Sequence, residues 1–438
     1  MTGIGEYAFA DCADLESVSI PDTVTRIGNY AFTGCAGLAE IAIPGSVSAI
    51  GQGVFYNCAS LADVSIANGV VSIGDNAFDS CAELASISIP ASVESISAVA
   101  FLNCTALSAI DVDEENAHYS SEAGVLYDKE QTLLVRYPAA KTGAYAFPDT
   151  LTGIGGYAFE RCVNLAEFSI PDGVTSIGDG AFIGCSGLTG VTFPEGVTYI
   201  PRYIFFSCGK LASVTIPHSV TSIGLSAFEF SSVADVYYFG TQEEWDAITF
   251  AGGNDSLISA TLHPVQTGAC GDRLTWTLYP DGALTISGTG RMWSYLTTPT
   301  PWGTGVTSLV IENGAASIVE YAFRGCAALE SVSIPDTVEA IDTGAFDACA
   351  ALTEVTVPGS VETIGLQAFA HCSNLSSLTL EEGIITIGLS AFSDCTSLTS
   401  VTIPASVTLI NDYAFYRCSA LTEALAAPGS SSDRKSVV

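Results

Sequence analysis

Basic residues are scarce in this chain. Its 438 residues contain 13 Lys and Arg against 47 Asp and Glu, which gives a formal net charge of −34. Nucleic acids and anionic bilayers are therefore excluded as partners, because their phosphate groups would repel this charge. Long hydrophobic runs are lacking as well, since no stretch reaches the roughly 18 apolar residues that a membrane-spanning helix needs. We therefore expect no membrane insertion.

Patterns that carry catalysis or metal binding are missing too. The 4 histidines show no H-E-x-x-H or similar ligand spacing, and no two cysteines form a C-x-x-C pair. Gly288 and Gly290 lack the third glycine and the following helix of a phosphate-binding loop. The sequence thus predicts no catalytic residue and no cofactor site, and we expect that the chain is not an enzyme.

A repeat of 23 residues dominates the sequence. It runs from Ile4, resumes at Ile154 and Ile318, and gives groups of five, four and five units. One unit reads I-G-x-x-A-F-x-x-C-x-x-L-x-x-V-x-I-P-x-S-V-x-x. Its few apolar positions cannot form a core alone, so stacking of units must bury them, as in a solenoid. The 48% of hydrophobic residues is enough for such a core.

Two segments of the unit predict different local structure. L-x-x-V-x-I alternates like a β-strand, and the proline after it ends the strand because it has no N–H to donate. One strand per unit predicts a parallel ladder. I-G-x-x-A-F-x-x-C spaces its apolar residues at helix-like intervals, which predicts a short helix or a turn.

The recurring L-x-x-V-x-I-P and I-G-x-x-A-F-x-x-C motifs resemble the BspA-like leucine-rich repeat surface protein family of bacteria. The resemblance covers nearly the whole chain. It implies a leucine-rich-repeat solenoid, an extracellular or cell-surface location, and adhesion or recognition as the activity. We expect the chain to be a fragment whose signal peptide and anchor lie outside it.

Breaks in the repeat predict the domain organisation. Two apolar runs around residues 128–130 indicate a β-hairpin, Thr241 and Glu244 form a capping box that begins a helix, and Tyr279-Pro280-Asp281-Gly282 indicates a hairpin turn. The predicted parts are a first solenoid (1–263) with a hairpin insertion (113–148) and a C-terminal cap (233–263), a β-hairpin spacer (264–305), a second solenoid (306–427), and a disordered or artefactual tail (428–438).

Thirteen of the 14 cysteines occupy one position of the repeat. Stacked neighbours would have parallel Cβ vectors, which suit disulfide geometry poorly. We therefore interpret them as a column of buried thiols that act as small hydrophobic groups. Cys270 stands outside the column.

A possible calcium site is the polar candidate with the most specific spacing. Asp111, Asp113, Glu115 and Glu122 fall at positions 1, 3, 5 and 12 of an EF-hand-like pattern. Asn116 replaces the usual glycine, and the flanking residues predict strands instead of helices. The alternative is a solvated acidic loop that leads into the hairpin.

The outward positions of the strands are the predicted partner-binding face. They carry mainly hydroxyl groups, with interleaved acids and no aromatic residues in the regular units, so aromatic contacts are expected near the second break. Candidate contact residues are Glu40, Asp63, Glu167, Glu354, Tyr237, Tyr238, Trp293 and Trp302. The predicted function is non-enzymatic recognition or adhesion by a monomer that binds a protein or glycan. The alternatives are an architectural spacer or the binding part of a larger secreted enzyme.

Overall fold

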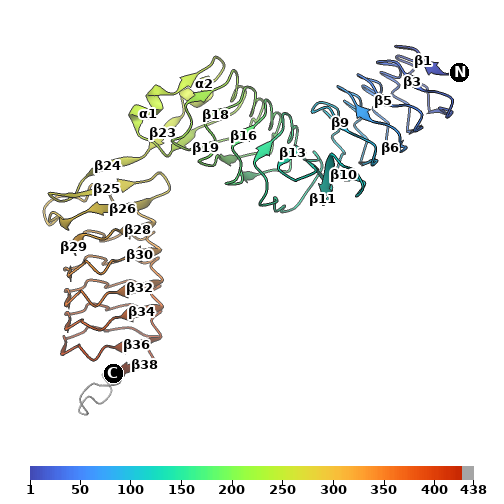
Figure 1. Cartoon of the computed structure of the whole chain (residues 1–438). Coiled ribbons are helices and arrows are strands. Elements are labelled where there is room, and N and C mark those ends of the chain that lie inside the picture. The colour runs from blue at the N-terminus through green and yellow to red at the C-terminus, as the bar shows by residue number, and fades with distance from the viewer. Residues whose placement is uncertain (427–438) are drawn as a thin grey trace. The chain divides into compact units, whose positions relative to one another are not determined.

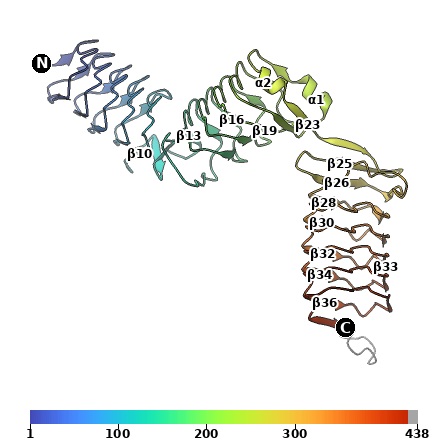
Figure 2. The same ribbon diagram turned by 180° about the vertical axis from the view of Figure 1, so that it is seen from behind.

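The computed structural model describes residues 1–426, which form two compact units, Met1–His263 and the chain from Pro264 onward. Each unit is a stack of short parallel strands (Figure 1), and the view from behind shows the same stacks (Figure 2). The predicted solenoid is confirmed. Residue 427 and the predicted tail, 428–438, lie outside the described residues.

The L-x-x-V-x-I segments form the first ladder of unit 1, here called the strand ladder. β4 and β6 illustrate its register, since Glu40 pairs with Asp63 and Ile41 with Val64. Residues along β4 are alternately exposed and buried, so the isoleucines enter the core. The strands are β2 (Ser17–Val18), β4 (Glu40–Ile43), β6 (Asp63–Ile66), β8 (Ser86–Ile89), β10 (Ala109–Val112), β15 (Glu167–Ser169), β17 (Gly190–Thr192), β19 (Ser213–Ile216), β21 (Asp235–Tyr238) and β23 (Thr261–Pro264).

Each repeat also contributes a second, two-residue strand that ends at the isoleucine before the glycine. The prediction of one strand per repeat is therefore incomplete, because two residues are too few to show an alternating pattern. These strands pair in parallel on either side of the insertion. They are β1 (Gly3–Ile4), β3 (Arg26–Ile27), β5 (Ala49–Ile50), β7 (Ser72–Ile73), β9 (Ser95–Ile96), β14 (Gly153–Ile154), β16 (Ser176–Ile177), β18 (Tyr199–Ile200), β20 (Ser222–Ile223) and β22 (Thr249–Phe250).

The I-G-x-x-A-F-x-x-C segments are turns, not helices. Two positions in most of these turns have a left-handed backbone, as at Tyr30 (φ 56°) and Asn57 (φ 61°). Such residues interrupt a right-handed helix after a few residues. Within the described residues the helices are α1 (Gln242–Ala247) and α2 (Asp255–Ile258), both outside the regular repeats. Neither of these two helices has the length and apolar character needed to cross a membrane.

The insertion is built into the stack. β11 (Tyr119–Glu122), β12 (Val125–Asp128) and β13 (Leu133–Arg136) form an antiparallel sheet, which includes the predicted hairpin around residues 128–130. β13 then pairs in parallel with β14, so it substitutes for a repeat strand. Residues 233–263 also extend the stack, because β21 pairs with β19, and β22 with β20. The predicted capping box of α1 is present at Thr241 and Glu244.

Unit 2 begins with an antiparallel meander of β24 (Gln266–Ala269), β25 (Leu274–Leu278) and β26 (Ala283–Gly288). This segment does not stand apart from the repeats after it, because β26 pairs in parallel with β28. The equivalent strand ladder of unit 2 comprises β28 (Ser308–Ile311), β30 (Ser331–Ser333), β32 (Glu354–Val357), β34 (Ser377–Leu380), β36 (Ser400–Ile403) and β38 (Glu423–Ala426). The second ladder comprises β27 (Gly290–Arg291), β29 (Ala315–Ile318), β31 (Ala340–Ile341), β33 (Thr363–Ile364), β35 (Thr386–Ile387) and β37 (Leu409–Ile410).

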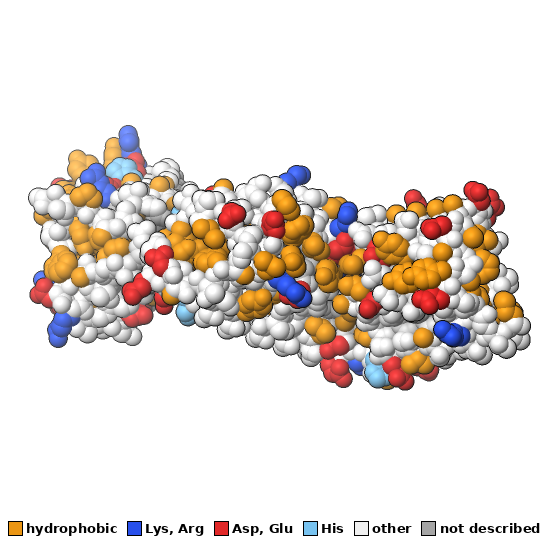
Figure 3. All heavy atoms as spheres, turned by 90° about the horizontal axis from the view of Figure 1, so that it is seen from above, with side chains coloured by type: hydrophobic (Ala, Val, Ile, Leu, Met, Phe, Trp, Pro, Cys, Tyr) orange, Lys and Arg blue, Asp and Glu red, His pale blue; other side chains and the backbone are white. Residues whose placement is uncertain are grey.

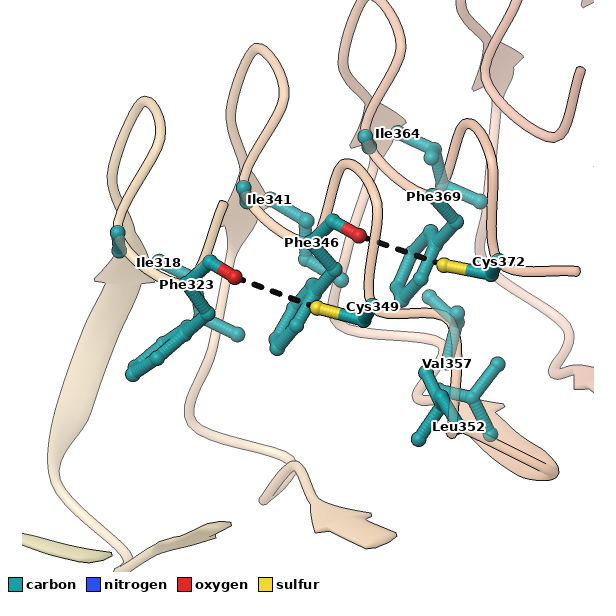
Figure 4. Packing of buried hydrophobic residues seen from close by; sticks show 14 of the residues in the cluster. Ile318, Phe323, Ile341, Phe346, Cys349, Leu352, Val357, Ile364, Phe369 and Cys372 are labelled. Atoms are coloured by element: carbon teal, nitrogen blue, oxygen red, sulfur yellow. Dashed lines mark hydrogen bonds between the residues drawn. The ribbon is translucent and has the colours of Figure 1, made fainter. Parts of the chain in front are cut away.

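Equivalent residues form columns in the core. Figure 4 shows the phenylalanine column of unit 2, in which the rings of Phe323 and Phe346 stack with centroids 5.3 Å apart. The insertion divides the core of unit 1, since Leu126 packs with the repeats before it and Tyr127 with the repeats after it. The core is thus a thin strip along each stack.

Candidate functional site

The exposed side of the strand ladder is a polar surface of unit 1. Glu40 and Asp63 occupy directly paired positions there and are both exposed. Together with Ser17, Ser19 and Ser65 they line a hollow of about 310 Å³. Strands β2 to β10 and β15 to β21 of this ladder carry no Lys or Arg. The face is therefore acidic and rich in hydroxyl groups.

An aromatic cluster that the sequence indicated only in part lies near the end of this face. The ring of Tyr237 stacks on that of His263 with centroids 4.8 Å apart. His263 Nε2 lies 2.8 Å from Asp235 Oδ1, which fixes the imidazole beside the tyrosine. On the other side Tyr237 is paired with Thr215, a much smaller residue. One face of the Tyr237 ring is thus covered by His263, while the side toward Thr215 is less obstructed.

Glu167 and Glu354 lie at exposed strand positions, and Trp293 is also exposed, with its Nε1 donating to Asp272 Oδ1 at 3.2 Å. Their role in binding stays a prediction. The prediction that Tyr238 and Trp302 contact a partner is wrong, because both side chains are buried. Even-numbered residues of β21 face the core, which places Tyr238 inward. Trp302 stacks on Phe323 and begins the phenylalanine column of unit 2.

The predicted calcium site does not form, because its four carboxylates are not gathered around one point. Residues 1–426 contain no group of three or more His, Cys, Asp or Glu side chains placed to hold a metal ion. Asp111 lies on the exposed side of β10, whereas Glu122 ends β11 in the antiparallel sheet. Asp113 Oδ1 accepts from the backbone N–H of Glu115. Asn116 is buried and donates to the Pro90 and Val93 carbonyls, so it anchors a turn to the preceding repeat.

The column cysteines are buried except Cys12, which is exposed. Their thiols also make a bond that the sequence did not predict. Cys58 Sγ donates to the Phe32 carbonyl at 3.1 Å, and the same bond recurs in successive repeats, two of which Figure 4 shows at Cys349 and Cys372. Burial raises the pKa of the Cys58 and Cys104 thiols to about 12, so they remain protonated donors.

Tyrosines on the turns are structural. Figure 3 shows one side of the molecule with hydrophobic side chains gathered in patches among scattered charges. In unit 1, Tyr30 lies against Gly53 of the next repeat, and a Cβ on that glycine would meet the ring at 2.3 Å. Tyr157 and Gly180 make the same contact. Half-buried rings of this kind pack along the stack and need no partner to explain them.

A cleft of about 640 Å³ beside the insertion is the second candidate site, and the sequence did not indicate it. Its lining includes Glu160 and Arg161. Glu160 Oε2 lies 2.9 Å from Nη2 of Arg136, and both side chains are buried. Arg136 also donates to the Phe101 carbonyl, for which the inserted strands offer no cysteine thiol, and to the Tyr157 carbonyl. The sequence gives no sign of the Arg136–Glu160 pair, because Arg136 lies in the insertion and Glu160 in a repeat.

The repeats match the family described as BspA type leucine-rich repeat region, at residues 2–123, 140–255 and 302–422. These matches span most of the chain, so the chain belongs to this family, as its repeat predicts. No curated protein matches the chain.

Several solved structures are similar to this chain. Pneumococcal vaccine antigen PcpA is 19% identical with a TM-score of 0.48, over 87% of this chain and 77% of that one. A leucine-rich cell surface protein from Faecalibacterium prausnitzii A2-165 is 29% identical with a TM-score of 0.29, over 82% and 83%. A leucine-rich repeat protein from Eubacterium ventriosum ATCC 27560 is 22% identical with a TM-score of 0.36, over 80% and 83%.

Proposed function

We propose that the chain is a non-enzymatic recognition or adhesion protein of the bacterial cell surface, which binds a protein or glycan through the exposed side of its strand ladder. The observation that carries this proposal is the Tyr237–His263 pair beside Asp235 on an otherwise hydroxyl-rich face. An aromatic ring with a polar neighbour is the usual energetic centre of a binding surface. Membership of the BspA type leucine-rich repeat family supports the proposed location.

Selection against the immobilised chain tests this proposal. A phage-displayed peptide library and a glycan array serve as probes, and the strongest binders are then measured against Tyr237→Ser. We expect binding to weaken at least about tenfold, because a central aromatic contact is removed. Tyr7→Ser is the control, since Tyr7 is an exposed tyrosine on a turn. Equal binding by wild type and Tyr237→Ser would contradict the role of this cluster. A chain that selects no binder at all would favour the architectural spacer.

A further inference from the structure

The cleft beside the insertion has features that the proposed strand-face function does not use. It lies within unit 1 and is lined by the insertion together with the turns of repeats on either side of it. Ala139 and Ala140 come from the insertion, and Asn103 and Ser186 from flanking repeats. Its volume of about 640 Å³ falls within the usual range of small-molecule sites.

Arg161 is held in this cleft with its terminal amino groups free. Its Nε lies 3.2 Å from Glu160 Oε1, and the buried Glu160 is itself fixed by Arg136 and by the backbone N–H of Asn103. Neither terminal nitrogen of Arg161 bonds to any residue of the described chain, and its side chain is 55% exposed. A guanidinium anchored through Nε keeps its two terminal nitrogens available as a two-pronged donor, which matches the two oxygens of a carboxylate.

The exposed charge in the cleft is the Arg161 guanidinium, although the whole chain is strongly acidic. Glu160 and Arg161 are the charged residues of the lining. Glu160 is buried and pairs with Arg136, and the Asp79 carboxylate, which accepts from Asn103 Nδ2 at 2.9 Å, is buried outside the lining. At physiological ionic strength, exposed charges farther away than about 8 Å are largely screened. An anionic group is therefore complementary to this site even though the net charge is −34.

The rest of the lining favours a ring with several hydroxyl groups. The hydroxyls of Thr105, Ser186 and Ser207 line the cleft and make no hydrogen bond within the described chain. Tyr157 and Phe206 supply flat apolar surface beside them. We propose that this cleft binds an acidic sugar, a pyranose with a carboxylate, and that Arg161 pairs with the carboxylate while the hydroxyls meet the ring.

Calorimetric titration of the full chain with D-glucuronate tests the proposal. D-glucose is the matched neutral ligand, because it has the same ring without the carboxylate. We expect glucuronate to bind at least about tenfold more tightly than glucose. Equal affinities would overturn the role of the carboxylate. Tighter binding of N-acetyl-aspartate than of glucuronate would overturn the assignment to a sugar.

The Arg161→Asn variant tests whether Arg161 pairs with the carboxylate of the sugar. Arg161 has a φ of 56°, and asparagine already occupies the equivalent left-handed positions at Asn57 and Asn103, so the fold should tolerate the change. We expect glucuronate affinity to fall by roughly ten- to a hundredfold. Arg417→Asn, at the equivalent position of unit 2, is the control and should leave affinity unchanged.

Unchanged binding by Arg161→Asn would overturn the proposal. Tyr237→Ser should still bind glucuronate normally, which separates this site from the strand face. Loss of glucuronate binding in that variant would also contradict an independent site in the cleft.

Discussion

Each core cysteine combines packing with a hydrogen bond. The phenylalanine carbonyl accepts from the backbone N–H of the cysteine in its own repeat, as Phe159 does from Cys162. The thiol of the following repeat donates a second bond to it without adding a strongly polar group to the core. Cys185, for example, donates to the Phe159 carbonyl at 3.0 Å. The column could be predicted from spacing. The bond could not, because donor and acceptor are 26 residues apart and meet only in the finished stack.

Cys185→Ala should therefore destabilise the protein by about 1–3 kcal/mol, because a cavity forms and the Phe159 carbonyl loses a donor. Cys185→Ser keeps a donor and should cost less. Urea denaturation of both variants gives the two free energies of unfolding. Equal losses would mean that the thiol contributes by packing alone.

The raised thiol pKa values predict an alkaline limit to stability. The pKa of Cys58 is 9.0 when the thiol is solvated and about 12 in the folded protein, because burial disfavours the thiolate. Above pH 9 the unfolded chain loses protons that the folded chain keeps, so the free energy of unfolding falls as pH rises from about 9 toward 12. Below pH 9 this contribution is fully present and constant.

Melting temperatures measured from pH 7 to pH 11 check this prediction. A variant with Cys58, Cys81 and Cys104 changed to Ser should decline less steeply above pH 9. An identical decline in the variant would mean that other groups cause the alkaline loss.

At the scale of the element, aromatic columns hold the repeats together. The column of unit 1 after the insertion begins with Tyr137, whose ring stacks on Phe159, and that of unit 2 begins with Trp302. The repeat pattern predicted the phenylalanines but not these first members, because each lies outside a regular unit and reaches the column only through its own loop.

Phe182→Ala should empty an interior position and cost about 3–5 kcal/mol of unfolding free energy. Phe182 is fully buried between Phe159 and Phe205. Phe9→Ala, at the same repeat position but 39% exposed, is the control and should cost clearly less. Guanidinium denaturation measures both. A near-neutral Phe182→Ala would show that the ring is not a core residue.

The insertion replaces regular stacking with a buried ion pair. Its hairpin was predictable from two apolar runs, but Arg136 gave no signal because its partner Glu160 lies in the next repeat. Arg136→Met should cost about 3–5 kcal/mol, since it leaves a buried carboxylate without this partner. Arg136→Met with Glu160→Met should regain much of the loss.

A double-mutant cycle in urea measures this coupling. Additive effects of the two substitutions would contradict a direct interaction between the side chains in solution.

At the scale of the whole molecule, the repeats place rows of polar side chains on the exposed side of the strand ladder. This arrangement was predictable, because strand alternation decides which side chains face outward. The Tyr237–His263 pair was predictable only in part, since His263 belongs to β23, an irregular strand beyond the last repeat of unit 1. The cleft at Arg161 was not predictable, because it depends on how the insertion meets its neighbours.

The central claim is that the strand face is the binding surface. The most direct measurement compares partner binding by two variants with equal changes in charge, using the binders selected on the wild-type chain. The first changes Glu40, Asp63, Glu167 and Glu354 to Ser. The second changes exposed acids outside the strands, namely Asp22, Glu83, Asp172 and Asp336, to Ser. We predict at least about tenfold weaker binding by the first variant and wild-type binding by the second. Equal binding by both would contradict the claim.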